Sequence, residues 1–428
     1  MTTAVMTLEH PATRLARWRL TIVAISVAVA ALPLLRPSGP GNTGMVDLAL
    51  VGALLVAGMW ASIRSHILRL PYALPVGLTV LAGALATANL EGAAATDGVS
   101  TSLLALVQDV FVFAWAAAVT TLGQDRKMLD VLCRAWAYSA TAWAFILIVG
   151  EIAGQNWLTG INARDGIRAS LTLGDPNLAA DYFIVALLVM RAAQRPRRTV
   201  RRWLACALVV TAIVLTLSNG GMLALVLATA CGALFRIARR RGLFVAVAVG
   251  VALALAGIGA TRVIDVHGWV TRVEASSPFV RDSLGRESES GGSRSTLIKE
   301  ASAVWLRGDS VLGLGPGNTE ATLRDRQAAY VKEAHNDYVA ALLERGVLGA
   351  TALVLLAATL AVRARRISVA GGIAPEFREV VPRPELLAAA VIAVAFSALF
   401  YEVLHFRHVW ALFGLVAALS LSSRRRPA

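Results

Sequence analysis

Long runs of apolar residues constrain this chain more than any other feature. They recur along its 428 residues, and most are about 16–24 residues long, the length of helix that crosses a hydrocarbon core. A segment in lipid must satisfy its backbone hydrogen bonds internally, so runs of this length form helices. With 57% hydrophobic and 16% charged residues, the chain is too apolar for a soluble domain. The sequence therefore predicts an all-α, polytopic membrane protein.

The apolar runs divide into twelve predicted membrane helices. They cover 20–35, 46–63, 72–90, 101–122, 129–150, 176–192, 203–217, 220–235, 243–260, 337–362, 385–402 and 407–422. The first run resembles a signal peptide, but we interpret it as a retained helix. The predicted regions are then 1–260 with nine helices, 261–336 as a large extracytoplasmic loop, and 337–428 with the last three helices.

The basic residues indicate the orientation of these helices. An even number of helices puts both termini on one side, and most Lys and Arg residues lie on that side once the long loop is discounted. We therefore expect both termini in the cytoplasm of a bacterium and the polar loops outside. The net charge of +14 reflects topology and affinity for anionic lipids rather than nucleic acid. The cysteines Cys133, Cys206 and Cys231 belong to apolar runs, which argues against disulfides or a cysteine metal site.

The first polar outer loop covers 151–175 and ends at a predicted helix start. Asp175 followed by Pro176 is typical of an N-cap with proline at the first helical position. Asp181 follows Asn177 by one helical turn and would be an ionisable group inside a membrane helix, which makes it a functional candidate. It could equally pair with a buried arginine or stay protonated.

The second outer loop covers 261–336 and is the longest polar interval in the chain. Residues 294–307 carry their apolar side chains on one helical face, which predicts an amphipathic helix on the membrane surface. The glycine-rich segment 312–318 follows as a turn, and it lacks the Lys-Ser/Thr ending of a phosphate loop. The loop ends at His335-Asn336, where the next helix begins.

A spaced motif begins at this histidine. His335-Asn336 is followed by nine residues, Gly346, two residues and Gly349, and this pattern resembles the H-N-x9-G-x-x-G signature of the O-antigen ligase and polymerase superfamily. Weaker features resemble the family in the same order: Arg168 before the helix start at 174–179, the turn at 217–221, and the glycines of 312–317. The turn departs from the family pattern at Asn219, where an arginine is common.

The resemblance implies a membrane-embedded, GT-C-like, inverting glycosyltransferase that needs no metal and no cofactor. Such an enzyme moves a glycan from undecaprenyl diphosphate to an acceptor hydroxyl on the outer side of the cytoplasmic membrane. Its partners would be the lipid-linked donor, a glycan or glycolipid acceptor and membrane lipids. The resemblance implies that His335 acts as the base and that loop arginines hold the diphosphate.

The residues themselves suit this chemistry. Histidine titrates at about pH 6.5 and can take a proton from an attacking hydroxyl, whereas the planar fork of arginine fits phosphate oxygens. The chain contains no D-x-D motif for a metal-bound nucleotide sugar. The candidate donor-binding residues are Arg164, Arg168, Arg281, Arg286 and Arg294, and the supporting residues are Asn177, Asp181, Asn336, Gly346 and Gly349.

Other interpretations stay open at this point. A loop arginine is commonly a solvated charge, and a histidine at a helix start is commonly a capping residue. Within the family the chain could be a polysaccharide polymerase or a protein O-oligosaccharyltransferase instead of a ligase. A twelve-helix transporter is an alternative of another class, although we see no internal duplication of the kind that such proteins carry.

Overall fold

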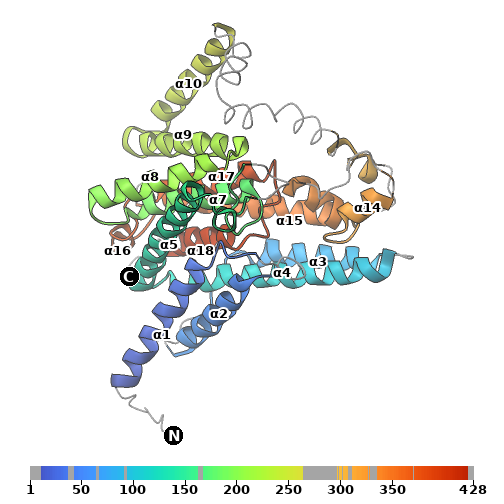
Figure 1. Cartoon of the computed structure of the whole chain (residues 1–428), viewed down its shortest axis with the longest axis horizontal. Coiled ribbons are helices and arrows are strands. Elements are labelled where there is room, and N and C mark those ends of the chain that lie inside the picture. The colour runs from blue at the N-terminus through green and yellow to red at the C-terminus, as the bar shows by residue number, and fades with distance from the viewer. Residues whose placement is uncertain are drawn as a thin grey trace.

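The computed structural model in Figure 1 describes most of the chain. The described residues are 11–36, 43–63, 67–90, 94–161, 167–263, 296, 298–300, 302–306, 311–325, 327, 335–369 and 371–422. None of them is in a strand. The helices are α1 (Pro11–Ala30), α2 (Met45–Ile63), α3 (Ala73–Ala88), α4 (Ala94–Leu122), α5 (Arg126–Ile152), α6 (Asn156–Thr159), α7 (Pro176–Ala193), α8 (Thr199–Leu215), α9 (Asn219–Arg241), α10 (Leu243–Val263), α14 (Thr319–Asp325), α15 (Asp337–Ser368), α16 (Pro375–Arg378), α17 (Glu385–Ser397) and α18 (Arg407–Ser422).

The predicted fold class agrees with this structure. Every predicted membrane helix overlaps one of the observed helices, and six of the described helices are long and apolar enough to cross a membrane, namely α2, α4, α5, α7, α9 and α15. The chain is thus an all-α protein with the helices of a polytopic membrane protein. That all twelve helices cross the membrane, and that 261–336 is extracytoplasmic, stay predictions.

Two predicted helices are too long. The helix predicted over 20–35 ends at Ala30 in α1. The prediction of a helix over 385–402 is wrong at its end, because α17 stops at Ser397. The backbone carbonyl of Ala398 instead accepts a hydrogen bond from the N–H of Asp337 at the head of α15. Residues 398–406 therefore form a loop between α17 and α18 that contacts α15, and an apolar run alone does not reveal this.

Helix α7 lies in the middle of the bundle in Figure 1. Its sequence is apolar on all sides, as expected for a helix surrounded by other helices, and it is buried along nearly its whole length. It packs against α5, α8, α9, α17 and α18. A second group of contacts joins α15 to α3 and α4 to α18. The core is thus a set of helices around α7.

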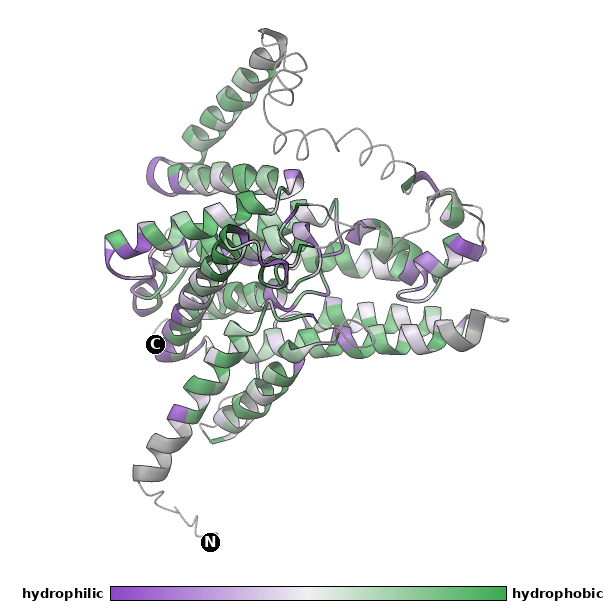
Figure 2. Ribbon diagram, in the orientation of Figure 1, coloured by the Kyte–Doolittle hydropathy of each residue, from purple (hydrophilic) through white to green (hydrophobic). Residues whose placement is uncertain are grey.

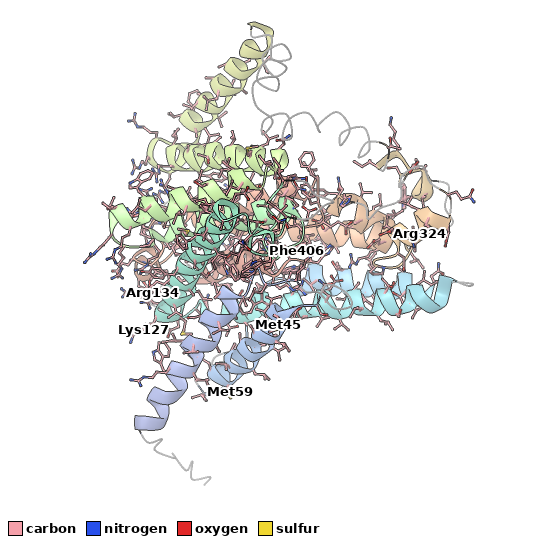
Figure 3. The ribbon with its side chains drawn as sticks, viewed as in Figure 1. Met45, Met59, Lys127, Arg134, Arg324 and Phe406 are labelled. Carbon is pink, nitrogen blue, oxygen red and sulfur yellow. The ribbon has the colours of Figure 1, made fainter. Side chains whose placement is uncertain are left out.

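The bundle has two chemically different ends. At the end that we call the site end, α2, α7, α9, α15 and α18 begin, and the loops between helices contact one another. At the other end, which we call the basic end, α9 ends in three arginines and α5 begins. Figure 3 labels Lys127 and Arg134 near the basic end and Phe406 at the site end, in the centre of the molecule. Figure 2 shows hydrophilic residues gathered around the central loops and at the turns flanking α8 and α9.

The predicted amphipathic helix lies partly on the protein. Of residues 294–307, the structure describes 296, 298–300 and 302–306, and all of these are helical. Val304 is buried against Leu323 of α14 and Leu343 of α15, with Trp305 packed beside them. Val304 and Trp305 of this segment therefore pack against α14 and the first part of α15, and its contact with a membrane surface stays a prediction.

Candidate active site

Arg168 is held by two elements at the site end. Its Nη2 donates to Asn177 Oδ1 over 2.8 Å, and its Nε donates to the carbonyl of Thr216 over 3.2 Å. The same Asn177 oxygen accepts a hydrogen bond from Ser218 Oγ over 2.8 Å. The predicted supporting residue Asn177 therefore orients Arg168 and joins the start of α7 to the turn between α8 and α9.

The start of α7 has the predicted cap. Asp175 Oδ1 accepts from the N–H of Asn177 over 2.7 Å, and Pro176 occupies the first turn. Gly174 precedes the cap with φ 78°, and a Cβ there would lie 2.1 Å from Nε of Arg36. Arg36 Nη2 donates to the Gly174 carbonyl over 3.2 Å. A second arginine, which the sequence did not single out, thus stands beside this helix N-terminus.

The turn between α8 and α9 reaches the other half of the site. Leu217 has φ 48°, and Ser218 caps α9 by accepting from the N–H of Gly221 over 3.0 Å. A Cβ on Gly220 would lie 3.6 Å from the ring of Tyr401. Because Tyr401 is in the loop that follows α17, this turn connects the Arg168 region with the loop that contacts His335.

His335 has a left-handed backbone at the head of α15. Its φ is 46°, and its N–H donates to Glu402 Oε1 over 3.2 Å. A non-glycine residue in this region is uncommon and indicates that the surroundings hold it there. The hydrogen bond to Glu402 is one of the contacts that do so.

The two residues after His335 are fastened to the same loop. Asn336 caps α15 through its Oδ1, and its Nδ2 donates to the carbonyl of Leu399 over 2.9 Å. Asp337 donates its N–H to the Ala398 carbonyl over 3.0 Å and accepts from the N–H of Val403 over 2.8 Å. Three consecutive residues of the motif therefore bind residues 398–403.

Glu402 lies between histidines. Its Oε2 is 3.4 Å from His405 Nε2, and 11% of its side chain is exposed. Burial by itself would raise the pKa of Glu402, but the hydrogen bond and charge of His405, followed by the charge and N–H of His335, lower it below the usual value. The carboxylate is therefore ionised at neutral pH.

The two motif glycines allow close backbone approach. Gly346 interrupts α15 with φ 62° and ψ −162°, and a Cβ there would lie 2.0 Å from the carbonyl oxygen of Val311. A Cβ on Gly349 would lie 2.3 Å from Cβ of Arg345. The segment 311–317 thus runs along the first part of α15, with Leu314 donating its N–H to the Leu343 carbonyl over 3.0 Å.

The charged residues inside α15 have structural partners. Glu344 accepts from the N–H of Gly317 over 2.9 Å and from Thr319 Oγ1 over 2.7 Å. Arg345 Nη2 lies 2.7 Å from Asp109 Oδ2 of α4. These side chains therefore fasten the glycine-rich segment and α4 to the helix that begins at the motif.

Asp181 pairs with a histidine rather than an arginine. Its Oδ2 is 2.9 Å from Nε2 of His408 in α18, and the two side chains are 2% and 1% exposed. The sequence did not single out His408, although Arg407 and His408 stand together at the head of a predicted helix. Arg407 itself makes two 2.9 Å hydrogen bonds to the carboxylate of Asp47 in α2.

The structure joins Arg168 to Asn177 and Asp181 to His408, and it places His335 and Asn336 against residues 398–403. Arg168, Asn177, Asp181, His335, Asn336, Gly346 and Gly349 all lie in the part of the chain that the structure describes. The other candidate arginines, Arg164, Arg281, Arg286 and Arg294, lie outside the described residues. Within the described residues no group of three or more His, Cys, Asp or Glu side chains could hold a metal ion, and the three cysteines are free.

Comparison with known proteins adds independent information. Residues 204–354 match the model of a family described as O-antigen ligase, whereas a search of curated proteins finds no similar sequence. The matched residues include the turn at 217–221, the glycine-rich segment, His335-Asn336 and both motif glycines. They exclude Arg168 and the loop 398–406. This part of the chain is therefore similar to O-antigen ligases, and the apolar helices around it are those of an integral membrane protein.

Proposed function

We propose that this protein transfers a glycan from undecaprenyl diphosphate to an acceptor hydroxyl, with His335 as the general base and without a metal ion. The observation that carries the proposal is the geometry of His335-Asn336-Asp337. These residues are fastened to residues 398–403 at the same end of the bundle as Arg168. A base and a phosphate-binding cation on neighbouring loops are the two groups that this reaction needs.

The arginine side of the site suits a diphosphate leaving group. A leaving diphosphate needs charge stabilisation, and arginine supplies a fixed fork of donors for phosphate oxygens. The guanidinium of Arg168 is oriented by Asn177 and Thr216, beside the N-terminus of α7, whose N–H groups favour an anion. Arg36 adds a second positive charge near Gly174.

The histidine side of the site suits activation of the acceptor. His335 is partly exposed, so a sugar hydroxyl can reach it. As the hydroxyl oxygen attacks the anomeric carbon, the imidazole takes its proton and the bond to the diphosphate breaks. General-base help of this kind contributes about 10²–10⁴ in rate.

The arginines of the basic end support the orientation. All twelve helices would cross the membrane, with both termini in the cytoplasm and the site end outside, because short loops rich in Lys and Arg stay in the cytoplasm. The acceptor would be lipid A core or another envelope glycan for a ligase. A second lipid-linked glycan would make the protein a polymerase, and a protein hydroxyl would make it an O-oligosaccharyltransferase.

The test is transfer by the purified full chain in nanodiscs, supplied with an undecaprenyl-diphosphate-linked glycan and candidate acceptors. We expect transfer to survive chelation by EDTA and to fall at least 10²-fold in His335→Ala. Tyr338→Phe, one turn after His335 in the variable part of the motif and with an exposed side chain, is the matched control and should transfer normally. Full activity in His335→Ala would exclude the proposed base. Loss of function in Asp181→Asn with intact His335→Ala would favour a transporter.

A further inference from the structure

The loop 398–406 lies outside the part of the chain that matches the O-antigen ligase family, yet its Glu402 accepts a hydrogen bond from the N–H of the motif histidine. We propose that Glu402 of this loop is a positioning residue for His335, which fixes its backbone and places a negative charge beside its imidazole. The proposal rests on the proposed function of His335 as the base. Glu402 itself is not expected to touch the substrate.

The first argument is geometric. Glu402 Oε1 accepts the N–H of His335 over 3.2 Å, at a residue whose φ of 46° places its backbone in the left-handed region. Such a conformation is unfavourable for a non-glycine residue and persists only where the surroundings over-determine it. The adjoining contacts of Asn336 and Asp337 go to the same loop. The loop therefore holds the backbone of His335 in this conformation.

The second argument is electrostatic. The carboxylate of Glu402 is mostly buried, and its second oxygen faces His405 Nε2 over 3.4 Å. The charged groups that face Glu402 come from the head of α15 and from its own loop: His335, Asp337, Glu344, Arg345 and His405. Arg345 is itself bound to Asp109 of α4. His335 lies beside Glu402, and its imidazole carries a positive charge only after it has taken a proton.

These observations give Glu402 a defined effect on the reaction. When His335 accepts the proton of the attacking hydroxyl it becomes an imidazolium, and a nearby carboxylate stabilises that charged form. Protonation of His335 in turn favours the ionised form of Glu402. Removal of the charge should therefore make His335 a weaker base without changing the affinity for the donor.

The decisive variant is Glu402→Gln. The glutamine keeps an oxygen that can accept the N–H of His335 but removes the negative charge. The readout is the pH dependence of diethyl pyrocarbonate modification at His335, followed by peptide mass spectrometry on the full chain in nanodiscs. This reagent reacts with the unprotonated imidazole, so the midpoint reports protonation of His335 directly. We expect the midpoint to move to lower pH by about one unit, because the stabilising charge is gone.

Two further variants separate positioning from folding. Glu402→Asp restores the charge on a shorter side chain, and its midpoint should return toward that of the natural protein. Glu379→Gln removes an exposed carboxylate that pairs with Arg126 at the basic end, and its midpoint should not move. In transfer assays Glu402→Gln should lower kcat about tenfold or more with KM for the donor within about twofold, the pattern of a weakened base.

The outcomes are distinguishable. An unshifted midpoint in Glu402→Gln overturns the coupling between Glu402 and His335, whatever the transfer assay shows. Where His335→Ala abolishes transfer, a normal kcat in Glu402→Gln also overturns the proposal. A shifted midpoint together with normal transfer in His335→Ala would overturn the proposed function of His335 and leave the coupling to Glu402 intact, because the modification assay does not depend on transfer.

Discussion

Buried carboxylates pair with arginines at the basic end of the bundle, whereas at the site end several non-glycine residues have left-handed backbones, and a carboxylate accepts the N–H of one of them, His335. At the basic end Glu385 is fully buried, with Arg239 at 2.9 Å and Arg236 at 3.6 Å, and Asp130 pairs with Arg195. The site end has ion pairs of its own, but it also contains three non-glycine residues with positive φ, namely Leu171, Leu217 and His335, whereas Gln194 at the end of α7 has this backbone at the basic end.

The difference indicates that the basic end contributes mainly to stability and the site end mainly to the geometry of the candidate site. A residue held in the left-handed region costs about 1–3 kcal/mol, and such residues cluster where geometry serves function. A buried carboxylate with two arginines instead fastens α17 to α9 without placing any group in an unusual conformation. We therefore expect changes at the basic end to affect stability, and changes at the site end to affect transfer.

The largest expected effect is at the basic end. Glu385→Leu leaves Arg239 and Arg236 without their carboxylate, and breaking a buried pair in this way costs about 3–5 kcal/mol. Unfolding can be followed by the reaction of a fluorescent maleimide with Cys133, which is 1% exposed in the folded protein. Transfer per folded molecule should stay normal. A Glu385→Leu variant that is stable but inactive would contradict the view that the basic end serves stability and the site end serves transfer.

At the site end, Arg168→Ala should reduce transfer by about 10²–10³-fold, since removal of one oriented donor from a charge-stabilising site has this effect. Arg168→Lys should be nearly as poor, because one ammonium group cannot satisfy both Asn177 and Thr216 in the geometry of the guanidinium. The maleimide assay should detect little change in stability. Arg324→Ala on α14, where the side chain is 67% exposed and pairs with Glu320, is the control and should transfer normally.

A substitution at the motif glycine should disturb both properties. Gly346→Ala places a methyl group 2.0 Å from the Val311 carbonyl at φ 62°, so the segment 311–317 must move. We expect a loss of about 1–3 kcal/mol in stability, the typical cost of a left-handed alanine, and reduced transfer. Gly52→Ala in α2, where an added Cβ meets nothing within 4 Å, should be neutral or stabilising. Equal effects of the two substitutions would contradict the role given to Gly346.

The smallest effect is expected at an exposed pair of the basic end. Arg126 and Glu379 are 54% and 64% exposed, so Arg126→Gln should change the free energy of unfolding by about 0–1 kcal/mol. Transfer should be unaffected. A large loss of stability in the maleimide assay would show that exposed and buried pairs at this end act as one network.

The sequence predicted the parts of this molecule that depend on local pattern. Apolar runs located the helices, Asp175-Pro176 predicted the start of α7, and the spacing of His335, Gly346 and Gly349 indicated the family. Each of these signals is contained within about one helix length. The predicted end at residue 402 failed because an apolar run does not show where a loop begins to serve another helix.

The partners in the site could not be read from the sequence. His335 meets Glu402 67 residues away, Asp181 meets His408 227 residues away, and Arg407 meets Asp47 360 residues away. Such pairs depend on which helices pack together, and no periodicity in one segment contains that information. Charged residues near helix ends were visible, but their pairing required the fold.

The position of loop 398–406 after His335 in the chain also has a consequence for synthesis of the protein. The histidine is synthesised before residues 398–406, and its hydrogen bonds to that loop form only after α17 has been made and α18 has begun. A ribosome-bound chain that ends at α15 therefore has the complete family motif without the contacts that hold it. We therefore expect a chain that ends at α15 to be inactive in transfer, and activity to require α17, α18 and the loop between them.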